Sequence, residues 1–220
     1  MTLQIKTFIL GPLENNTYLI WDPNSNQAVV IDPSFNPGPV IDQIRQRELR
    51  LQAVWLTHAH FDHFAGASQI IHAFPDPADL LVHGKDLQLW QNGGESRVFG
   101  IKMDLSVTPG PLLYDNQTLT VGKFTFTVLP TPGHTPGHVA YHCPESKTAF
   151  CGDLIFRYSI GRTDLGGDYN TLMHSIETQI LTMPPDTVLY SGHGENSTVE
   201  EQIRTNPFVT LRNRRPGFPE

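Results

Sequence analysis

The sequence predicts an α/β protein in which two β-sheets are stacked and helices cover their outer faces. Two observations lead to this class. Short β-branched or aromatic runs, separated by Gly, Pro and Asn turns, recur in both halves of the chain, and helical patterns follow them in each half. No linker composition divides the chain and no short repeat is present, so we expect a single domain spanning residues 1–220.

In the first half, apolar β-formers bounded by turn residues predict strands at 4–10, 17–22, 27–32, 51–57 and 80–83. Pro37-Gly38-Pro39 opens a helix that closes near residue 48, because the apolar residues between them fall on one face. A second helical pattern follows the strand at 51–57, with apolar positions from Phe64 to Phe74. Residues 84–117 contain Gly and Pro breakers and no regular period, so no element is assigned there.

In the second half, the same composition predicts strands at 118–121, 123–130, 138–143, 147–152 and 187–192. A helix is expected at 169–181, where Leu172, Ile176 and Ile180 share a stripe and Asp168 can cap the first turn. The last helix is expected at 198–204.

Composition narrows the setting of the protein. Fifteen Lys and Arg against 22 Asp and Glu give a net charge of −7, which argues against nucleic acid or an anionic membrane as a partner. No run of about 18 apolar residues is present, which argues against a membrane span, and the N-terminus is a poor secretory signal. Two cysteines are too few for a disulfide framework, so we expect a cytoplasmic protein. The C-terminal Arg212, Arg214 and Arg215 are expected to form an exposed end.

The residues that carry chemistry begin directly after the strand at 51–57. Within six residues the chain places His58, His60, Asp62 and His63. Neutral imidazole and carboxylate are the usual nitrogen and oxygen ligands of zinc and similar divalent ions. The spacing therefore predicts a metal site at the end of this strand.

Three further candidates, His134, Asp153 and His193, each lie just past the end of a predicted strand. Strand ends on one rim of a sheet bring loops from distant sequence into one place. Seven candidate ligands exceed what one tetrahedral ion needs, so the simplest arrangement is two metal ions that share one carboxylate.

These motifs resemble the metallo-β-lactamase superfamily in order and setting. The resemblance rests on His-x-His-x-Asp-His at 58–63, followed by Gly133-His134, Gly152-Asp153 and Gly192-His193, with Val30-Ile31-Asp32 near the start. It implies an αββα sandwich of two mixed sheets with helices on the outer faces. It also implies a ligand set: His58, His60 and His134 for the first metal, Asp62, His63 and His193 for the second, Asp153 as the bridge, and Asp32 as a buried support of the metal loops.

Within the superfamily, the chain looks most like the small bacterial glyoxalase II-like (hydroxyacylglutathione hydrolase-like) proteins. Five stretches carry this similarity: Thr131-Pro-Gly-His-Thr-Pro-Gly-His138, Gly152-Asp-Leu-Ile-Phe156, Ser159-Ile-Gly-Arg-Thr-Asp164, Gly192-His-Gly194 and Arg204-Thr-Asn-Pro-Phe208. It implies two divalent ions, most readily Zn²⁺ with Fe or Mn in one or both sites as alternatives, and a small anionic thioester substrate such as S-lactoylglutathione. The chain departs from full-length glyoxalase II in ending before its C-terminal helical region and in having Gly194-Glu195-Asn196 where that family has a Tyr.

The expected chemistry is attack by a metal-bound hydroxide on the thioester carbonyl, since paired metals lower the pKa of bound water to about 7. The sequence supports no side-chain nucleophile, because it has neither a Gly-x-Ser-x-Gly elbow nor a Cys-x-x-Cys pair. A thiolate leaves readily, so no strong protein acid is required. Arg162 is the candidate contact for an anionic substrate, and the alternative is an internal ion pair of Arg162 with Asp164 or Asp168.

Other functions remain open at this point. Persulfide dioxygenases share the superfamily motifs and use a single iron held by the equivalents of His58, His134 and Asp153. Lactone or phosphoester hydrolysis is a further alternative. A non-catalytic binding protein is disfavoured because all seven ligands are present. The resemblance implies a monomer or a homodimer.

Overall fold

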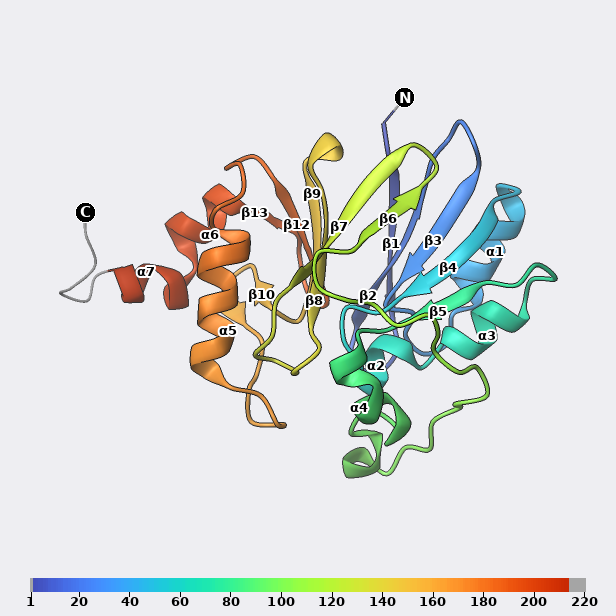
Figure 1. Ribbon diagram of the computed structural model, residues 1–220, viewed down its shortest axis with the longest axis horizontal. Coiled ribbons are helices and arrows are strands. Elements are labelled where there is room, and N and C mark those ends of the chain that lie inside the picture. The colour runs from blue at the N-terminus through green and yellow to red at the C-terminus, as the bar shows by residue number, and fades with distance from the viewer. Residues whose placement is uncertain (1, 214–220) are drawn as a thin grey trace.

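The computed structural model describes residues 2–213, and two β-sheets lie face to face at its centre (Figure 1). Within these residues one sheet has the strand order β1-β2-β3-β4-β5, and the other has the order β13-β12-β9-β8-β7-β6. Each sheet combines parallel and antiparallel pairs. Helices cover both outer faces (Figure 1). The predicted αββα sandwich of two mixed sheets is therefore confirmed.

The strands of the first sheet are β1 (Gln4–Leu10), β2 (Asn15–Trp21), β3 (Gln27–Ile31), β4 (Arg50–Trp55) and β5 (Asp79–Leu81). The strands of the second sheet are β6 (Thr118–Val121), β7 (Phe124–Pro130), β8 (Val139–Cys143), β9 (Thr148–Gly152), β12 (Val188–Ser191) and β13 (Ser197–Thr198). A separate hairpin pairs β10 (Ile155–Phe156) with β11 (Ser159–Ile160).

The helices beside the first sheet are α1 (Gly38–Gln46), α2 (Phe61–Phe64), α3 (Ala67–His72) and α4 (Leu87–Gln91). The helices beside the second sheet are α5 (Tyr169–Ser175), α6 (Val199–Thr205) and α7 (Pro207–Asn213). Short 3₁₀ turns are η1 (Gly84–Asp86), η2 (Ser96–Phe99) and η3 (Pro144–Ser146), and α5 continues into a π-helical turn, η4 (Ile176–Ile180).

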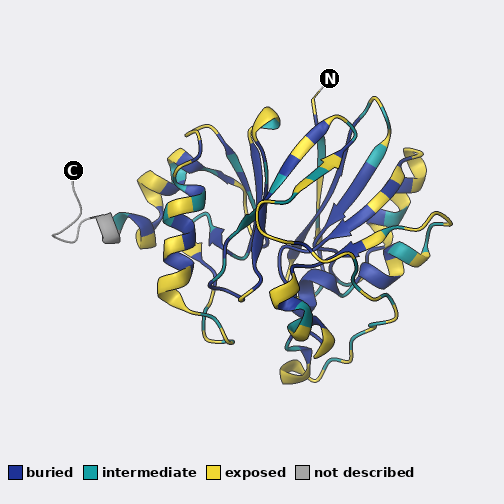
Figure 2. Cartoon of the chain, viewed as in Figure 1, coloured by how far each residue is buried: buried dark blue, intermediate teal, exposed yellow. Residues whose placement is uncertain are grey.

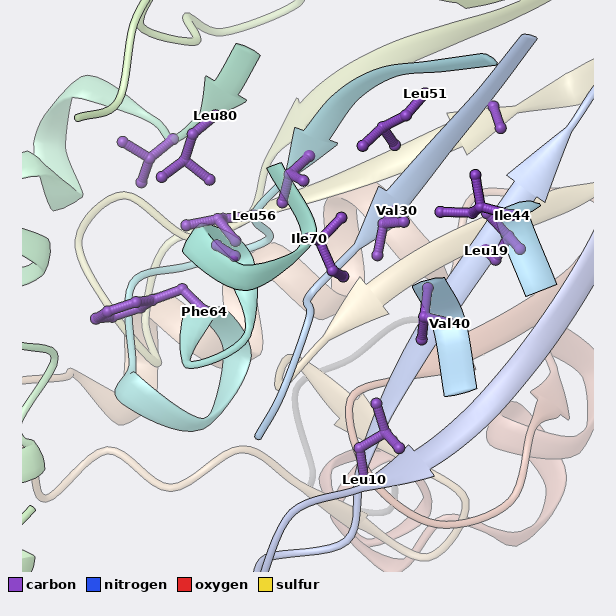
Figure 3. Close-up of a cluster of buried hydrophobic side chains, with 14 of the residues drawn as sticks. Leu10, Leu19, Val30, Val40, Ile44, Leu51, Leu56, Phe64, Ile70 and Leu80 are labelled. Carbon is purple, nitrogen blue, oxygen red and sulfur yellow. The ribbon is translucent and has the colours of Figure 1, made fainter. Parts of the chain in front are cut away.

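Three buried apolar clusters hold these four layers together. Side chains alternate along each strand, so on β2 Leu19 packs toward α1–α4 while Ile20 packs between the sheets. On β9, Phe150 likewise lies between the sheets and Cys151 faces α5 and α6. Figure 3 shows the cluster between the first sheet and α1–α4, here called the outer cluster, in which Val40 and Ile44 of α1 pack against the first sheet. Burial on both faces explains why the strands appear in the sequence as apolar runs. Figure 2 shows that the exposed residues are concentrated on the outer faces of the helices.

The structure departs from the predicted elements mainly where elements are short. The stretch 84–117, for which the sequence predicts no regular element, contains η1, α4 and η2. Strands of two residues, such as β10 and β13, are too short to show a period. Helix α7, which was not predicted from the sequence, begins at Pro207, and the side chain of Asn206 accepts a hydrogen bond from the Phe208 amide in its first turn. Arg214 and Arg215 lie outside the described residues.

Strand direction explains where the predicted site residues converge. β9 and β12 run parallel, and β7 shares their direction because both β7 and β9 run antiparallel to β8. Their carboxyl ends therefore meet at one edge of the second sheet. In the first sheet β3 and β4 are parallel and also end together. Among the described residues, no helix is long and apolar enough to cross a membrane.

Candidate metal centre

The first four candidate ligands are held by the loop after β4 and by the short helix α2. His58 and His60 lie in the loop, and Asp62 and His63 lie on α2 itself. The helix is fixed because Phe61 and Phe64 pack into the outer cluster, where Figure 3 shows Phe64. All four candidate ligands are buried.

The structure brings all seven predicted ligands together, in two groups of three joined by one carboxylate. The ligand atoms of His58, His60 and His134 lie within 4.8 Å of one another, and so do those of Asp62, His63 and His193. Asp153 lies between the groups: its Oδ1 is 3.4 Å from His63 Nε2, and its Oδ2 is 3.7 Å from both His134 Nε2 and His193 Nε2.

In three of the histidines, the Nδ1 atom lies within hydrogen-bonding distance of an oxygen that can only accept a hydrogen bond. His63 Nδ1 lies 2.9 Å from Asp32 Oδ2, and the Nδ1 atoms of His134 and His193 lie 2.7 Å and 3.0 Å from main-chain carbonyl oxygens. Each Nδ1 must therefore carry a hydrogen. In the neutral ring this leaves a lone pair on Nε2, which faces Asp153.

Asp32 lies behind the metal loop. Its carboxylate accepts hydrogen bonds from the Thr57 amide at 2.8 Å, from Thr57 Oγ1 at 2.7 Å and from His63 Nδ1 at 2.9 Å. Thr57 Oγ1 also lies 3.0 Å from His58 Nδ1, so Asp32 supports His63 directly and His58 through Thr57. Both oxygens of Asp32 are occupied by these donors, which suits a supporting role better than that of a ligand.

The carboxylates around His63 favour a positive charge at this position. Burial lowers the pKa of His63, but Asp62, Asp153 and Asp32 outweigh it and raise that pKa to about 10. Burial raises the pKa of Asp62, but His63 and His193 bring it well below its usual range. In the other group, burial together with nearby His134 lowers the pKa of His60 to about 3. In the metal-free chain, the proton on His63 therefore supplies the positive charge that a bound cation would supply to the neighbouring carboxylates.

The donor set fits divalent metal ions. It consists of five imidazoles and two carboxylates, which are the nitrogen and oxygen ligands that zinc, iron and manganese accept. Six buried side-chain polar atoms of the described residues have no hydrogen-bond partner, and three of them, His58 Nε2, His60 Nε2 and Asp153 Oδ1, belong to the candidate ligands. Buried polar atoms are normally paired, and three unpaired ones converging on one place fit a bound cation.

A cavity of about 260 Å³ opens onto the two groups. It is lined by five of the candidate ligands, His60, Asp62, His134, Asp153 and His193, and by Leu13, Phe61, Gly94, Glu95, Phe99, Arg162 and Leu165. The Arg162 guanidinium donates two hydrogen bonds of 2.7 Å to Asp164. Arg162 therefore lines the cavity but is ion-paired with Asp164, which is the alternative stated for it, and its contact with a substrate stays a prediction.

Residues that hold the His193 loop were not predicted from the sequence. Asn16 Nδ2 donates to the carbonyl oxygens of Ser191 at 3.0 Å and Gly194 at 2.8 Å, and Tyr18 Oη donates to Ser191 O at 2.5 Å. Asn15 and Asn16 begin β2, and both side chains are buried. Buried amides are rarely left without a specific partner.

The fold and this centre define a metalloprotein of the metallo-β-lactamase type. A profile described as the metallo-beta-lactamase superfamily matches residues 10–193, and the chain belongs to that superfamily. It is 34% identical over 216 residues to the hydroxyacylglutathione hydrolase GloC of Haemophilus influenzae, a match covering 96% of this chain and 100% of GloC. It is 33% identical over 210 residues to the human mitochondrial persulfide dioxygenase ETHE1, covering 93% of this chain and 71% of ETHE1.

Solved structures agree with this placement. The BLEG-1 B3 metallo-beta-lactamase superposes with a TM-score of 0.88 at 36% identity, covering 94% of this chain and 100% of BLEG-1. TTHA1623, crystallised in a di-iron-bound form, superposes with a TM-score of 0.81 at 36% identity, covering 92% of this chain and 99% of TTHA1623. The fold is thus shared with a protein that was crystallised in a di-iron-bound form.

Proposed function

We propose that this protein is a metal-dependent hydrolase of the glyoxalase II type that cleaves a thioester such as S-lactoylglutathione. The observation that carries the proposal is the joining of two three-residue metal-binding groups by the Asp153 carboxylate beneath an open cavity. A divalent metal pair, when bound, supplies a water-derived nucleophile at neutral pH and polarises a carbonyl oxygen. The similarity to GloC over the whole chain supports the thioester as substrate.

The ligands are proposed to divide as the two groups do. His58, His60 and His134 would hold one ion, Asp62, His63 and His193 the other, and Asp153 both. Zinc suits this mixed nitrogen and oxygen set, and iron or manganese are the alternatives. The di-iron form of TTHA1623 supports a dinuclear centre with iron as one of those alternatives.

The remaining residues of the cavity bind and orient the substrate. Leu13, Phe61 and Phe99 form an apolar wall that shields the reacting bond from bulk water. Arg162 would exchange its partner, Asp164, for a carboxylate of the substrate, because a guanidinium pairs with either in the same two-bond geometry. Departure of a thiolate needs no strong acid, so the proposal assigns no general acid.

A second candidate function is persulfide dioxygenation, which the 33% identity with ETHE1 favours. The two functions are separated by assaying metal-loaded protein for S-lactoylglutathione hydrolysis and for oxygen uptake with glutathione persulfide. Hydrolysis that is lost in His58→Ala and retained in His174→Ala, an exposed histidine of α5, would support the hydrolase. Oxygen uptake without hydrolysis would overturn it.

A further inference from the structure

Asp86 is a buried carboxylate that neither the metal motifs nor the cavity includes. It ends the 3₁₀ turn η1, and its side chain is fully buried. The carboxylate accepts three hydrogen bonds: Oδ2 from the Ala59 amide at 3.1 Å and from Thr135 Oγ1 at 2.7 Å, and Oδ1 from the Gly137 amide at 2.6 Å. Its partners thus come from two loops that are far apart in the sequence.

These two loops are the ones that supply the first metal-binding group. Ala59 stands between His58 and His60 in the chain, and Thr135 directly follows His134. One carboxylate therefore fastens the peptide between two ligands of this group to the residue after the third. The second group is supported by other residues, since Asp32 and Asn15 contact His63 and Asn16 holds the loop of His193.

The surroundings of Asp86 are built for this carboxylate. Burial raises its pKa, and the hydrogen bonds from Thr135, Gly137 and Ala59 act against that rise. Burying a carboxylate without an ion-pair partner is unfavourable unless donors surround it, and here three do. A Cβ at position 137 would lie 2.7 Å from Asp86 Oδ1 and 2.6 Å from the Asp86 amide nitrogen, so the chain approaches closely only because residue 137 is glycine.

We propose that Asp86 is a positioning residue that fixes the geometry of the His58, His60 and His134 group and thereby sets the affinity of the metal ion held there. It acts through Ala59 and Thr135 and does not touch the ion. The inference rests on metal binding at this centre, as in the proposed function, but not on the identity of the substrate. Asp32 contacts His63 directly and reaches His58 only through Thr57, whereas the contacts of Asp86 are confined to the two loops that supply the first group.

The test is Asp86→Asn, which keeps the size of the side chain but turns one acceptor oxygen into a donor. At least one of the three donors then loses its acceptor. Zinc titration of the metal-free protein against a chromophoric chelator gives the affinity of each ion, and the absorption spectrum of the cobalt-loaded protein reports the geometry. We expect one ion to bind about 10- to 100-fold more weakly, the usual effect of removing a hydrogen-bond partner behind metal ligands, with the other ion changed by less than about threefold.

Asp22→Asn is the matched control. Asp22 is also buried and accepts bonds from the Asn24 amide, Ser25 Oγ and the Lys123 amide, but it follows the end of β2 remote from Asn15. This variant is expected to lose stability while both zinc affinities and the cobalt spectrum stay unchanged. A variant of Asp86 that behaves like Asp22→Asn, or that weakens both ions equally, overturns the proposal.

A second pair of variants decides the matter if Asp86→Asn does not fold. Thr135→Val removes only the hydroxyl that bonds Asp86, and Thr135→Ser keeps it. The proposal requires weaker binding of one ion in the first variant and recovery in the second. Equal affinities in the two variants contradict it. A chain that binds zinc normally yet hydrolyses no thioester would overturn the proposed function and leave this comparison intact.

Discussion

Replacing Asp32 by Asn tests whether the buried carboxylate organises the metal loop. Asp32 has a φ of 50°, a left-handed conformation that Asn tolerates nearly as well as Asp, so the backbone is retained. If the amide nitrogen takes the place of Oδ2, two buried donors, Thr57 Oγ1 and His63 Nδ1, lose their acceptor.

The size of the effect follows from those two contacts. A buried donor left without an acceptor costs about 1–3 kcal/mol, and the Thr57 hydroxyl can rotate to relieve part of its share. We therefore expect a loss of about 3 kcal/mol in the free energy of unfolding of the metal-free protein. For a domain of this length that corresponds to a fall in Tm of about 6–12 °C. Zinc affinity should fall about 10- to 100-fold, because His63 loses the partner that orients its ring.

Urea and thermal unfolding of the metal-free protein give the stability change, and chelator competition gives the zinc affinity. Asp104→Asn is the control, since Asp104 is an exposed carboxylate that accepts a bond from the Ser106 amide. A loss below about 0.5 kcal/mol in Asp32→Asn, the level of ordinary surface substitutions, would refute the reasoning, as would an unchanged zinc affinity.

Three further predictions concern the centre and its cavity. Gly192→Ala places a Cβ 2.1 Å from Asp153 Oδ1, so the zinc affinity measured by chelator competition should fall at least about tenfold. The control is Gly38→Ala, whose Cβ meets nothing within 4 Å and whose zinc affinity should equal that of the wild type. Zinc binding at about pH 7 should release at least one proton and should become tighter as the pH rises, because a pKa of about 10 keeps His63 protonated in the metal-free chain. Calorimetry in buffers of different ionisation enthalpy measures the number of protons released. Binding without proton release would argue against this prediction. Asp164→Asn removes the ion-pair partner of Arg162 and should lower KM for S-lactoylglutathione with little change in kcat. Arg162→Gln should raise KM about tenfold. An unchanged KM in both variants would mean that Arg162 does not contact the substrate.

The sequence predicted those parts of the centre in which the chemistry lies in the residue types themselves. His58, His60, Asp62 and His63 are close in sequence, and their spacing alone indicated a metal site. Short apolar runs bounded by turn residues predicted the sheets, because strands buried on both faces carry a strong compositional signal.

What the sequence did not predict depends on tertiary contacts. Asp86 is a single acidic residue in a stretch without a period, and only the folded chain places it against Ala59 and Thr135. Asn16 likewise bonds a loop about 175 residues away, a contact that no local pattern contains. Arg162 could be placed near the site but not assigned a partner, because two acidic residues follow it within six positions.

The central claim is that two metal-binding groups share Asp153 and hold two ions. Elemental analysis of freshly purified protein, expressed as metal per chain, tests it most directly. The account predicts close to two divalent ions per chain, falling toward one in a His193→Ala variant that keeps the first group intact. A ratio of one that added zinc, iron or manganese does not raise would contradict the dinuclear centre, and no retained metal at all would contradict the metal centre itself.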